Sequence, residues 1–186
     1  YKVSDKPYDK LHFPIHDYFF AKALDQVRPG GVVAFITSKG TMDKQNPDVR
    51  RYIARRAELL GAVRLPNNAF KANAGTEVTS DILFLQKRDR MVDQLPAWVN
   101  LGIDANGLAI NQYFVDNPSM VLGTMQEVSG PYGPETACLP IDGSSLEELL
   151  TDAIQNINGS VMEYEVDDPE SEEEDRSIPA DPSVRN

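Results

Sequence analysis

Five consecutive apolar residues, 32–36, constrain the fold of this chain more than any other segment. They read Val-Val-Ala-Phe-Ile and follow a Pro-Gly-Gly turn at residues 29–31. A short, continuously apolar, β-branched run is typical of a strand buried on both faces, as in a parallel sheet covered by helices. Apolar residues at helical spacing precede it from Ile15 to Val27, and Pro14 suits the first turn of that helix. We therefore expect an α/β fold.

The alternation of helix and strand continues to residue 90. Residues 47–60 have helical spacing, and Gly61 is expected to end that helix. Residues 62–65 predict a short strand, residues 67–76 a polar loop, and residues 78–86 a longer strand. The link between these last two strands has no helix and is short for a parallel crossover. The last strand is therefore expected to run antiparallel to its neighbours.

The chain after residue 90 has a different composition. Residues 1–90 carry a net charge of +6, residues 91–158 hold nine acids and no Lys or Arg, and residues 159–186 carry −8. A turn at Asn106-Gly107, a short helix at 111–115, a short strand at 137–141 and a helix capped by Ser144 or Ser145 predict a small acidic α+β region over 91–158. Acids and prolines crowd the rest, so we expect residues 159–186 to be a disordered acidic tail or linker. The positive balance of residues 1–90 suits a polyanionic partner, although charge alone favours cations that simply coat exposed helices.

Several kinds of chemistry are excluded by the sequence. Cys138 is the only cysteine, which rules out an internal disulfide framework and a Cys-based zinc site. His12 and His16 flank the expected helix start and do not share a face, so no metal site is expected. The phosphate-loop string is absent. No apolar run is long enough for a membrane helix and the start lacks a signal peptide, so we expect a cytoplasmic chain without a membrane partner.

Two polar loops are expected to meet at one edge of the sheet. Residues 37–41 follow the first strand and residues 67–76 follow the second, and ligands of open α/β sheets bind beyond the carboxyl ends of parallel strands. An aromatic side chain among amides and cations suits stacking and edge reading of a nucleobase. Composition leaves open the alternative that the aromatic packs into the core and the polar residues only solvate a loop. The candidate rim residues are Ser38, Lys39, Asn67, Asn68, Phe70, Lys71, Asn73 and Thr76.

Three segments resemble the class I, S-adenosylmethionine-dependent N6-adenine DNA methyltransferases. Residues 15–36 are similar to the part that follows the family's Asn-Pro-Pro-Phe motif, where a helix leads to Pro-Gly-Gly and the fifth strand. Residues 64–70 and 75–87 are similar to the sixth strand, the base-stacking loop and the antiparallel seventh strand. Residues 113–123 also look like a segment just beyond the methylase core of the large helicase–methylase proteins of phages and mobile elements.

The resemblance implies that residues 1–90 are the second half of a Rossmann-like methyltransferase sheet, strands five to seven. The family's glycine-rich cofactor motif and its Asn-Pro-Pro-Phe motif are absent from this sequence and would precede Tyr1. The resemblance therefore implies a fragment that is inactive alone, holds no catalytic residue and binds no S-adenosylmethionine, which belongs to the parent enzyme. Its partners would be DNA and the remainder of the parent chain, including a helicase region.

Residue roles follow from the same resemblance. Phe70 would stack on the target adenine after the base is flipped out of the duplex. Lys39, Arg64 and Lys71 are expected near the DNA backbone, whereas the arginines at 50, 51, 55 and 56 are expected to face solvent. Strand 32–36 would be an open sheet edge, which predicts self-association through it or coverage by residues 1–13.

Two other functions stay open at this point. The chain could be a non-catalytic interaction module built on a degenerate methyltransferase-like scaffold, with the acidic half binding a partner or mimicking the charge of DNA. A methyltransferase that acts on protein glutamine or on RNA is the second alternative, because Asn-Pro-Pro motifs serve those reactions too.

Overall fold

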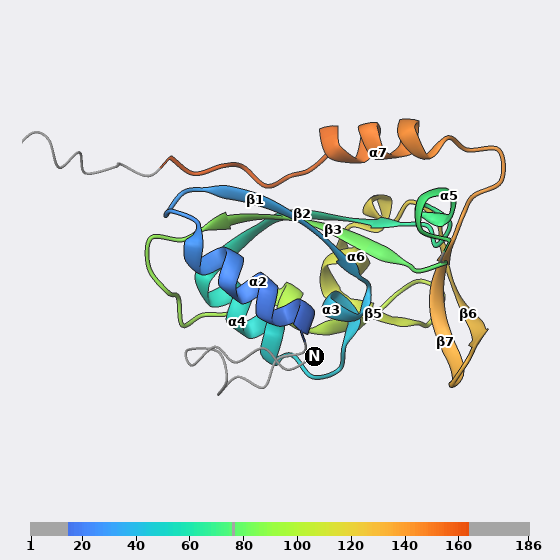
Figure 1. Cartoon of the computed structure of the whole chain (residues 1–186), viewed down its shortest axis with the longest axis horizontal. Helices are drawn as coiled ribbons and strands as arrows, with labels where there is room; N and C mark the ends of the chain where they lie inside the picture. The colour runs from blue at the N-terminus through green and yellow to red at the C-terminus, as the bar shows by residue number, and fades with distance from the viewer. Residues whose placement is uncertain (1–14, 76, 164–186) are drawn as a thin grey trace, which may run out of the picture.

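A single three-stranded sheet organises the chain in the computed structural model, which describes residues 15–75 and 77–163 (Figure 1). Strands β1 (Val32–Ser38), β2 (Ala57–Leu65) and β3 (Ser80–Lys87) lie in the order β1-β3-β2. β3 is antiparallel to both neighbours, so β1 and β2 run parallel to each other. The expected α/β fold with an antiparallel last strand is confirmed.

Helices α2 (Ile15–Gln26) and α4 (Asp48–Arg56) cover one face of this sheet (Figure 1). α2 buries Phe20 and Leu24, which are four residues apart and therefore share one side of the helix. The Phe20 ring lies 4.4 Å, centroid to centroid, from the ring of Phe35 on β1. The aromatic contact fixes α2 over β1.

Strand β2 begins earlier than the sequence predicts. α4 ends at Arg56, and residues 57–60, expected in the helix, belong to β2 instead; Ala57 lies opposite Lys87 and Leu59 opposite Leu85, and Leu60 is skipped in the pairing with β3. Gly61 lies inside the strand, where the pairing register shifts, rather than at a helix end. The helical spacing of residues 47–60 was misleading because pairing with β3 overrides local propensity.

The region after β3 begins with a hairpin, β4 (Leu101–Ile103) and β5 (Ala109–Asn111), which confirms the turn predicted at Asn106-Gly107. Gly107 has φ of 81°, a left-handed conformation that glycine adopts without strain. The predicted helices are also present, as α6 (Gln112–Asp116) and as α7 (Leu146–Gln155), in which Ser145 accepts a hydrogen bond from the Glu148 amide. Two short 3-10 helices, η1 (Ala97–Val99) and η2 (Pro118–Met120), complete this part.

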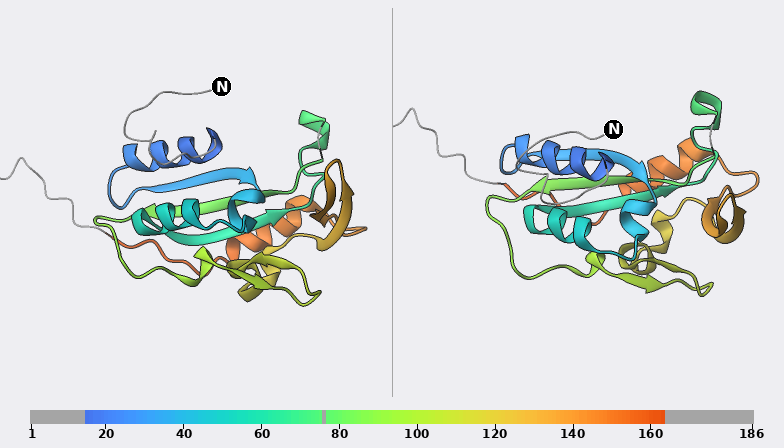
Figure 2. Two further views of the ribbon diagram at one scale, coloured as in Figure 1. Left: turned by 90° about the horizontal axis from the view of Figure 1, so that it is seen from below. Right: turned by 60° about the horizontal axis from the view of Figure 1, so that its bottom comes forward.

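A second ribbon, β6 (Thr124–Gly130) paired with β7 (Gly133–Leu139), projects at one end of the sheet (Figure 2). Only a strand at residues 137–141 was expected here. The ribbon shows almost no alternation of apolar and polar residues, because most of its side chains are exposed, so periodicity could not find it.

The hydrophobic core does not divide at residue 90. Leu24 and Leu83 belong to the same buried cluster as Phe114, Cys138 and Ala153 from the later region. α7 lies on the sheet face opposite α2, over β2 (Figures 1 and 2). The acidic region is therefore part of the same packed body as the sheet.

Gly159 and Met162, which were expected to lie in a disordered tail, contact β2 and β3 instead. Gly159 packs against the Leu60 backbone, where a Cβ would lie 2.0 Å from the carbonyl oxygen, so only glycine fits. The side-chain amide of Gln86 donates to the Met162 carbonyl at 2.6 Å and accepts from the Met162 backbone N–H at 2.9 Å. Residues 164–186 lie outside the described part of the chain. None of the described helices has the length and apolar character of a bilayer-spanning segment.

Strand β1 is an edge of the sheet. Among the described residues it pairs with β3 alone, and Val32 and Ile36 are 48% and 62% exposed. The open edge expected at residues 32–36 is therefore present. Residues 1–13, which were expected to cover it if self-association does not, lie outside the described residues.

Candidate functional site

The carboxyl ends of β1 and β2 meet at one rim of the sheet. Ser38, the last residue of β1, and Leu65, the last residue of β2, both lie opposite Ser80, the first residue of β3. The two loops that leave this rim therefore begin side by side. The prediction that residues 37–41 and the loop after residue 66 share one edge of the sheet is confirmed.

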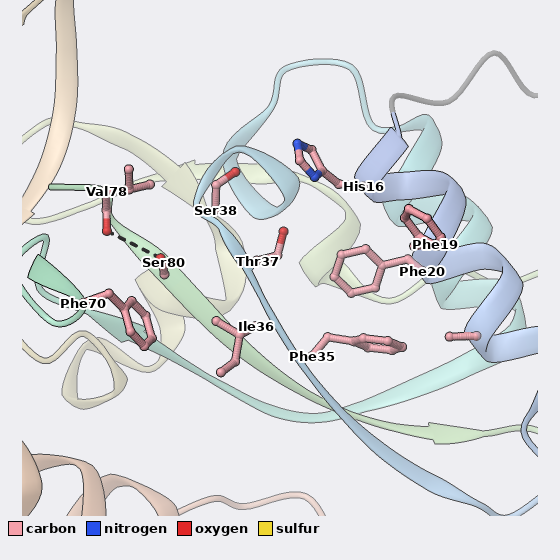
Figure 3. A pocket seen from close by; sticks show the side chains of 11 residues that line it. His16, Phe19, Phe20, Phe35, Ile36, Thr37, Ser38, Phe70, Val78 and Ser80 are labelled. Carbon is pink, nitrogen blue, oxygen red and sulfur yellow. Dashed lines mark hydrogen bonds between the residues drawn. The ribbon is translucent and has the colours of Figure 1, made fainter. Parts of the chain in front are cut away.

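A cavity of about 730 Å³ opens at this rim beside the free edge of β1 (Figure 3). Most of its lining is apolar, and its polar groups are hydroxyls and one imidazole. The side chains lie on both sides of β1, with Phe19 and Phe20 of α2 on one side and Ile36 and Phe70 on the other. The lining consists of His16, Phe19, Phe20, Ala23, Phe35, Ile36, Thr37, Ser38, Phe70, Val78 and Ser80.

Phe70 forms one wall of this cavity. It immediately precedes the short helix α5 (Lys71–Ala74), whose C-cap Gly75 has φ of 67° and turns the chain back toward β3. The ring is half-buried and also touches the hydrophobic core. The structure thus combines the two alternatives left by the sequence, because the ring both packs inward and faces a cavity large enough for a ligand.

The polar rim residues occupy different environments. Ser38 lines the cavity, and the Lys39 amide bonds the Thr79 carbonyl at 2.9 Å. Lys71 pairs with Glu77, with Nζ and Oε1 2.5 Å apart, and both side chains are more than half exposed. Asn68 and Asn73 are exposed and Asn67 is half-buried. The backbone N–H of Asn67 donates to the Cys138 carbonyl at 2.7 Å. Thr76 lies outside the described residues.

Arg64 does not face DNA, and that expectation is wrong. Its side chain is completely buried and forms a bidentate pair with Asp81, at 2.8 Å for both contacts. Asp43 accepts two further bonds from it, at 2.7 and 2.9 Å. Burial alone would lower the pKa of Arg64, but Asp81 and Asp43 outweigh burial and raise it, so the guanidinium stays charged. Its role is to join β2, β3 and the turn after β1.

Arg50 is likewise buried, although it was expected in solvent. Its Nε donates to the Val99 carbonyl at 2.7 Å and its Nη1 to the Thr41 carbonyl at 3.2 Å. The buried Asn111 amide donates to the Met42 carbonyl at 2.8 Å. Together with Arg64, these side chains bond every residue of 41–43 in α3 (Gly40–Asp43). The turn that carries Ser38 and Lys39 is therefore held rigidly at the rim.

Sequence reasoning missed the α2 and β1 side of the cavity. Phe19, Phe20 and Phe35 read only as core positions, because their spacing is that of buried residues. Phe19 is nevertheless 58% exposed, since nothing among the described residues covers the outer side of α2. Exposure of an apolar residue depends on what packs against it, and spacing alone carries no signal for that.

The described residues include no group of three side chains that could hold a metal ion. The thiol of Cys138 is buried, which raises its pKa to about 12 and leaves it un-ionised at neutral pH. The Cys138 side chain is therefore a neutral thiol rather than a thiolate nucleophile. The cavity offers shape, aromatic rings and a few hydroxyls, which suit binding and orientation of an uncharged aromatic ligand.

Comparison with known proteins gives one partial likeness. The chain is 34% identical over 94 residues to Defense against restriction protein B of Escherichia phage P1. The matched segment is 50% of this chain but only 4% of the phage protein. No family model matches the chain, and no solved structure matches it. The likeness therefore concerns a small part of a far longer protein.

Proposed function

We propose that this chain is part of an S-adenosylmethionine-dependent DNA adenine-N6 methyltransferase, and that it supplies the base-stacking loop and the DNA-facing rim. In the proposed reaction, a methyl group passes to N6 of an adenine that has been flipped out of the duplex. This chain would hold the flipped base. The groups that bind the cofactor would come from another part of the parent protein.

The sheet supports the proposal through its strand order. The resemblance implies two parallel strands followed by an antiparallel last strand, and the arrangement β1-β3-β2 has this pattern. The free edge of β1 is where the sheet of such an enzyme would continue toward its cofactor-binding strands. Exposed apolar residues on β1 and α2, such as Ile36 and Phe19, suit a surface that the remainder of the domain covers.

The aromatic cavity carries the proposal most directly. Phe70 lies in the loop where the family's stacking aromatic is expected, and its ring lines the cavity at the rim. Stacking of a base on an aromatic ring is worth about 1–3 kcal/mol. Unstacking a base from duplex DNA costs a few kcal/mol, so a stacking wall offsets much of that cost.

The cavity lining does not suit the cofactor itself. None of the described residues that line it is a carboxylate, whereas a nucleoside ribose is commonly bound through an Asp or Glu. An uncharged base fits the phenylalanines, Ser38 and Thr37 better. We therefore assign to these residues the binding and orientation of the base, with water excluded by the rings, and no part in holding S-adenosylmethionine.

The phage relative is compatible with this assignment. That protein is described as acting in defence against restriction. A methyl group on adenine N6 projects into the major groove, where DNA-binding proteins read base edges. Modification of DNA bases would change what such proteins read, and this supports a DNA-modifying role for the present chain within the proposal.

Replacing Phe70 tests the proposal. In the full-length protein that contains this chain, Phe70→Ala should lower adenine methylation about 5- to 150-fold, the range expected for a loss of 1–3 kcal/mol of stacking. Phe70→Trp should retain most of the activity, since any large aromatic face can stack. The methylated base would be quantified by mass spectrometry of digested DNA.

Thermal unfolding of each variant provides the control. If Phe70→Ala lowers the amount of folded protein but leaves the activity per folded molecule unchanged, Phe70 is a core residue and the stacking assignment is wrong. If the fully folded parent protein methylates RNA or protein but not DNA, then DNA is not the substrate and the proposal is wrong on that point.

A further inference from the structure

A second, smaller cavity of about 330 Å³ lies next to the aromatic one, where the start of α2 faces the turn after β1. The two cavities share His16 and Ser38 in their linings. Their occupants would therefore be neighbours. Unlike the aromatic cavity, this one is lined mainly by polar and charged side chains.

Asp17 is the unusual group in this lining. It is only 7% exposed, and no described residue hydrogen-bonds to its carboxylate or forms an ion pair with it. Burial raises the pKa of Asp17, although Lys44 and His16 partly oppose the shift. The Asp17 carboxylate lines the cavity without a hydrogen-bond partner among the described residues, so it is open to a ligand there.

The charges around Asp17 restrict what can bind beside it. Lys39 and Lys44 line the same cavity and would repel a cation. The other acid in the lining, Asp43, already accepts hydrogen bonds from the Arg64 guanidinium and from the backbone N–H of Asn111. A bare anion would meet the Asp17 carboxylate. The lining therefore suits a ligand that combines a neutral hydrogen-bond donor with an anionic group, as a nucleotide does.

We propose that this cavity holds the nucleotide adjacent to the target adenine, with an exocyclic amino group of its base donating to Asp17 and its phosphate near Lys39 and Lys44. The inference rests on the proposed function, because it places this nucleotide on the DNA strand whose adenine enters the aromatic cavity. Asp17 is then a specificity-determining residue. Cytosine, with its N4 amino group, should be favoured over thymine, which presents a carbonyl at the same position.

Oligonucleotide binding tests the inference in the full-length protein. Two labelled single-stranded oligonucleotides would each carry one adenine, flanked on both sides by cytosines in one and by thymines in the other. Fluorescence anisotropy at fixed salt would give their dissociation constants. We expect about tenfold tighter binding of the cytosine-flanked strand, the size of one hydrogen bond to a charged group.

The near-isosteric change Asp17→Asn should reduce this preference to less than about twofold, because the amide can donate to the thymine carbonyl as well as accept. Asp89→Asn is the matched control. Asp89 is exposed and follows β3 at the end of the sheet away from the rim, so this variant should keep the preference. Equal binding of the two strands, or an unchanged preference in Asp17→Asn, would overturn the inference.

A third strand separates this test from that of the proposed function. It carries cytosine flanks and an abasic site in place of the adenine. The proposed function predicts that losing the adenine weakens binding by the wild-type protein but not by Phe70→Ala. If that dependence is present and the Asp17 effect is not, only the further inference fails. An Asp17-dependent cytosine preference without any dependence on Phe70 would instead refute the stacking site.

Discussion

The role of Arg64 in the structure differs from the role that its position in the sequence suggests. A cation at the end of a strand near a nucleic-acid loop reads as a phosphate contact. The structure instead places it between Asp43 and Asp81, with its guanidinium 4.5 Å from the centre of the Phe114 ring. The partners are distant in sequence, so no local pattern could reveal the cluster.

Removing Arg64 should therefore damage the fold rather than a DNA contact. Arg64→Met leaves two acids without their cation in a buried setting and should lower the free energy of unfolding by about 3–5 kcal/mol. Urea denaturation measures the change. Arg51→Met, which removes an exposed arginine 3.8 Å from Asp48, should change stability by less than about 0.5 kcal/mol. Similar losses in the two variants would contradict the buried ion-pair account.

Asp17 gives a prediction that depends on pH. Its pKa is raised in the folded state above the ordinary value of 3.8, chiefly by burial. The ionised carboxylate is therefore disfavoured by folding, and this penalty is present above the folded pKa and disappears as pH falls toward 3.8. Asp17→Asn should raise the melting temperature at pH 7, and the gain should vanish in acid.

Differential scanning calorimetry between pH 3.5 and 7 follows this effect, with Asp89→Asn as the exposed control. A lower melting temperature for Asp17→Asn at pH 7 would mean that the carboxylate forms a favourable contact in the free protein. That result would remove the argument that Asp17 awaits a ligand.

At the scale of helices and strands, the periodicity of the sequence predicted the elements whose formation depends on residues close together in the chain. The helices α2, α6 and α7 and the hairpin at residues 101–111 follow from apolar spacing, caps and the Asn-Gly turn. The start of β2 did not, since Ala57 and Leu59 fit a helix as well as a strand, and only their pairing with β3 decides between the two. The β6–β7 ribbon lacks alternation, and only the Gly130-Pro131-Tyr132-Gly133 turn could have suggested it.

The candidate site divides in the same way. The order of the strands in the sequence predicts that the two loops lie at one rim and that Phe70 lies in one of them. The buried polar bonds that fix α3, and the second cavity around Asp17, depend on contacts between segments far apart in sequence. Arg50 illustrates the difference, because its partners Thr41 and Val99 come from both sides of it along the chain.

The free edge of β1 predicts self-association of the 186-residue chain. The strand has no Lys, Pro or Gly to block pairing, and Ile36 is 62% exposed. Light scattering at increasing concentration should show a mass above that of the monomer. Ile36→Lys should restore the monomer, whereas Ile103→Lys, at a residue with the same 62% exposure on β4, should not. A wild-type monomer at all concentrations would show that the edge is covered, with residues 1–13 the first segment to delete.

At the scale of the whole molecule, the sheet and the acidic region form one body with an aromatic cavity of about 730 Å³ at one rim. The aromatic cavity offers a wall for a base, and its described lining residues include no carboxylate for a ribose. We therefore expect that the isolated 186-residue chain does not bind S-adenosylmethionine. Isothermal titration calorimetry checks this. Micromolar binding by the isolated chain would contradict the proposal that the cofactor is bound by another part of the parent protein.

The most direct test of the central claim is the identity of the product. DNA would be incubated with isotopically labelled S-adenosylmethionine and either the full-length protein or the 186-residue chain, then digested and analysed by mass spectrometry. The account predicts labelled N6-methyladenine with the full-length protein and none with the chain alone. A folded full-length protein that binds the cofactor and yet leaves adenine unlabelled would contradict it.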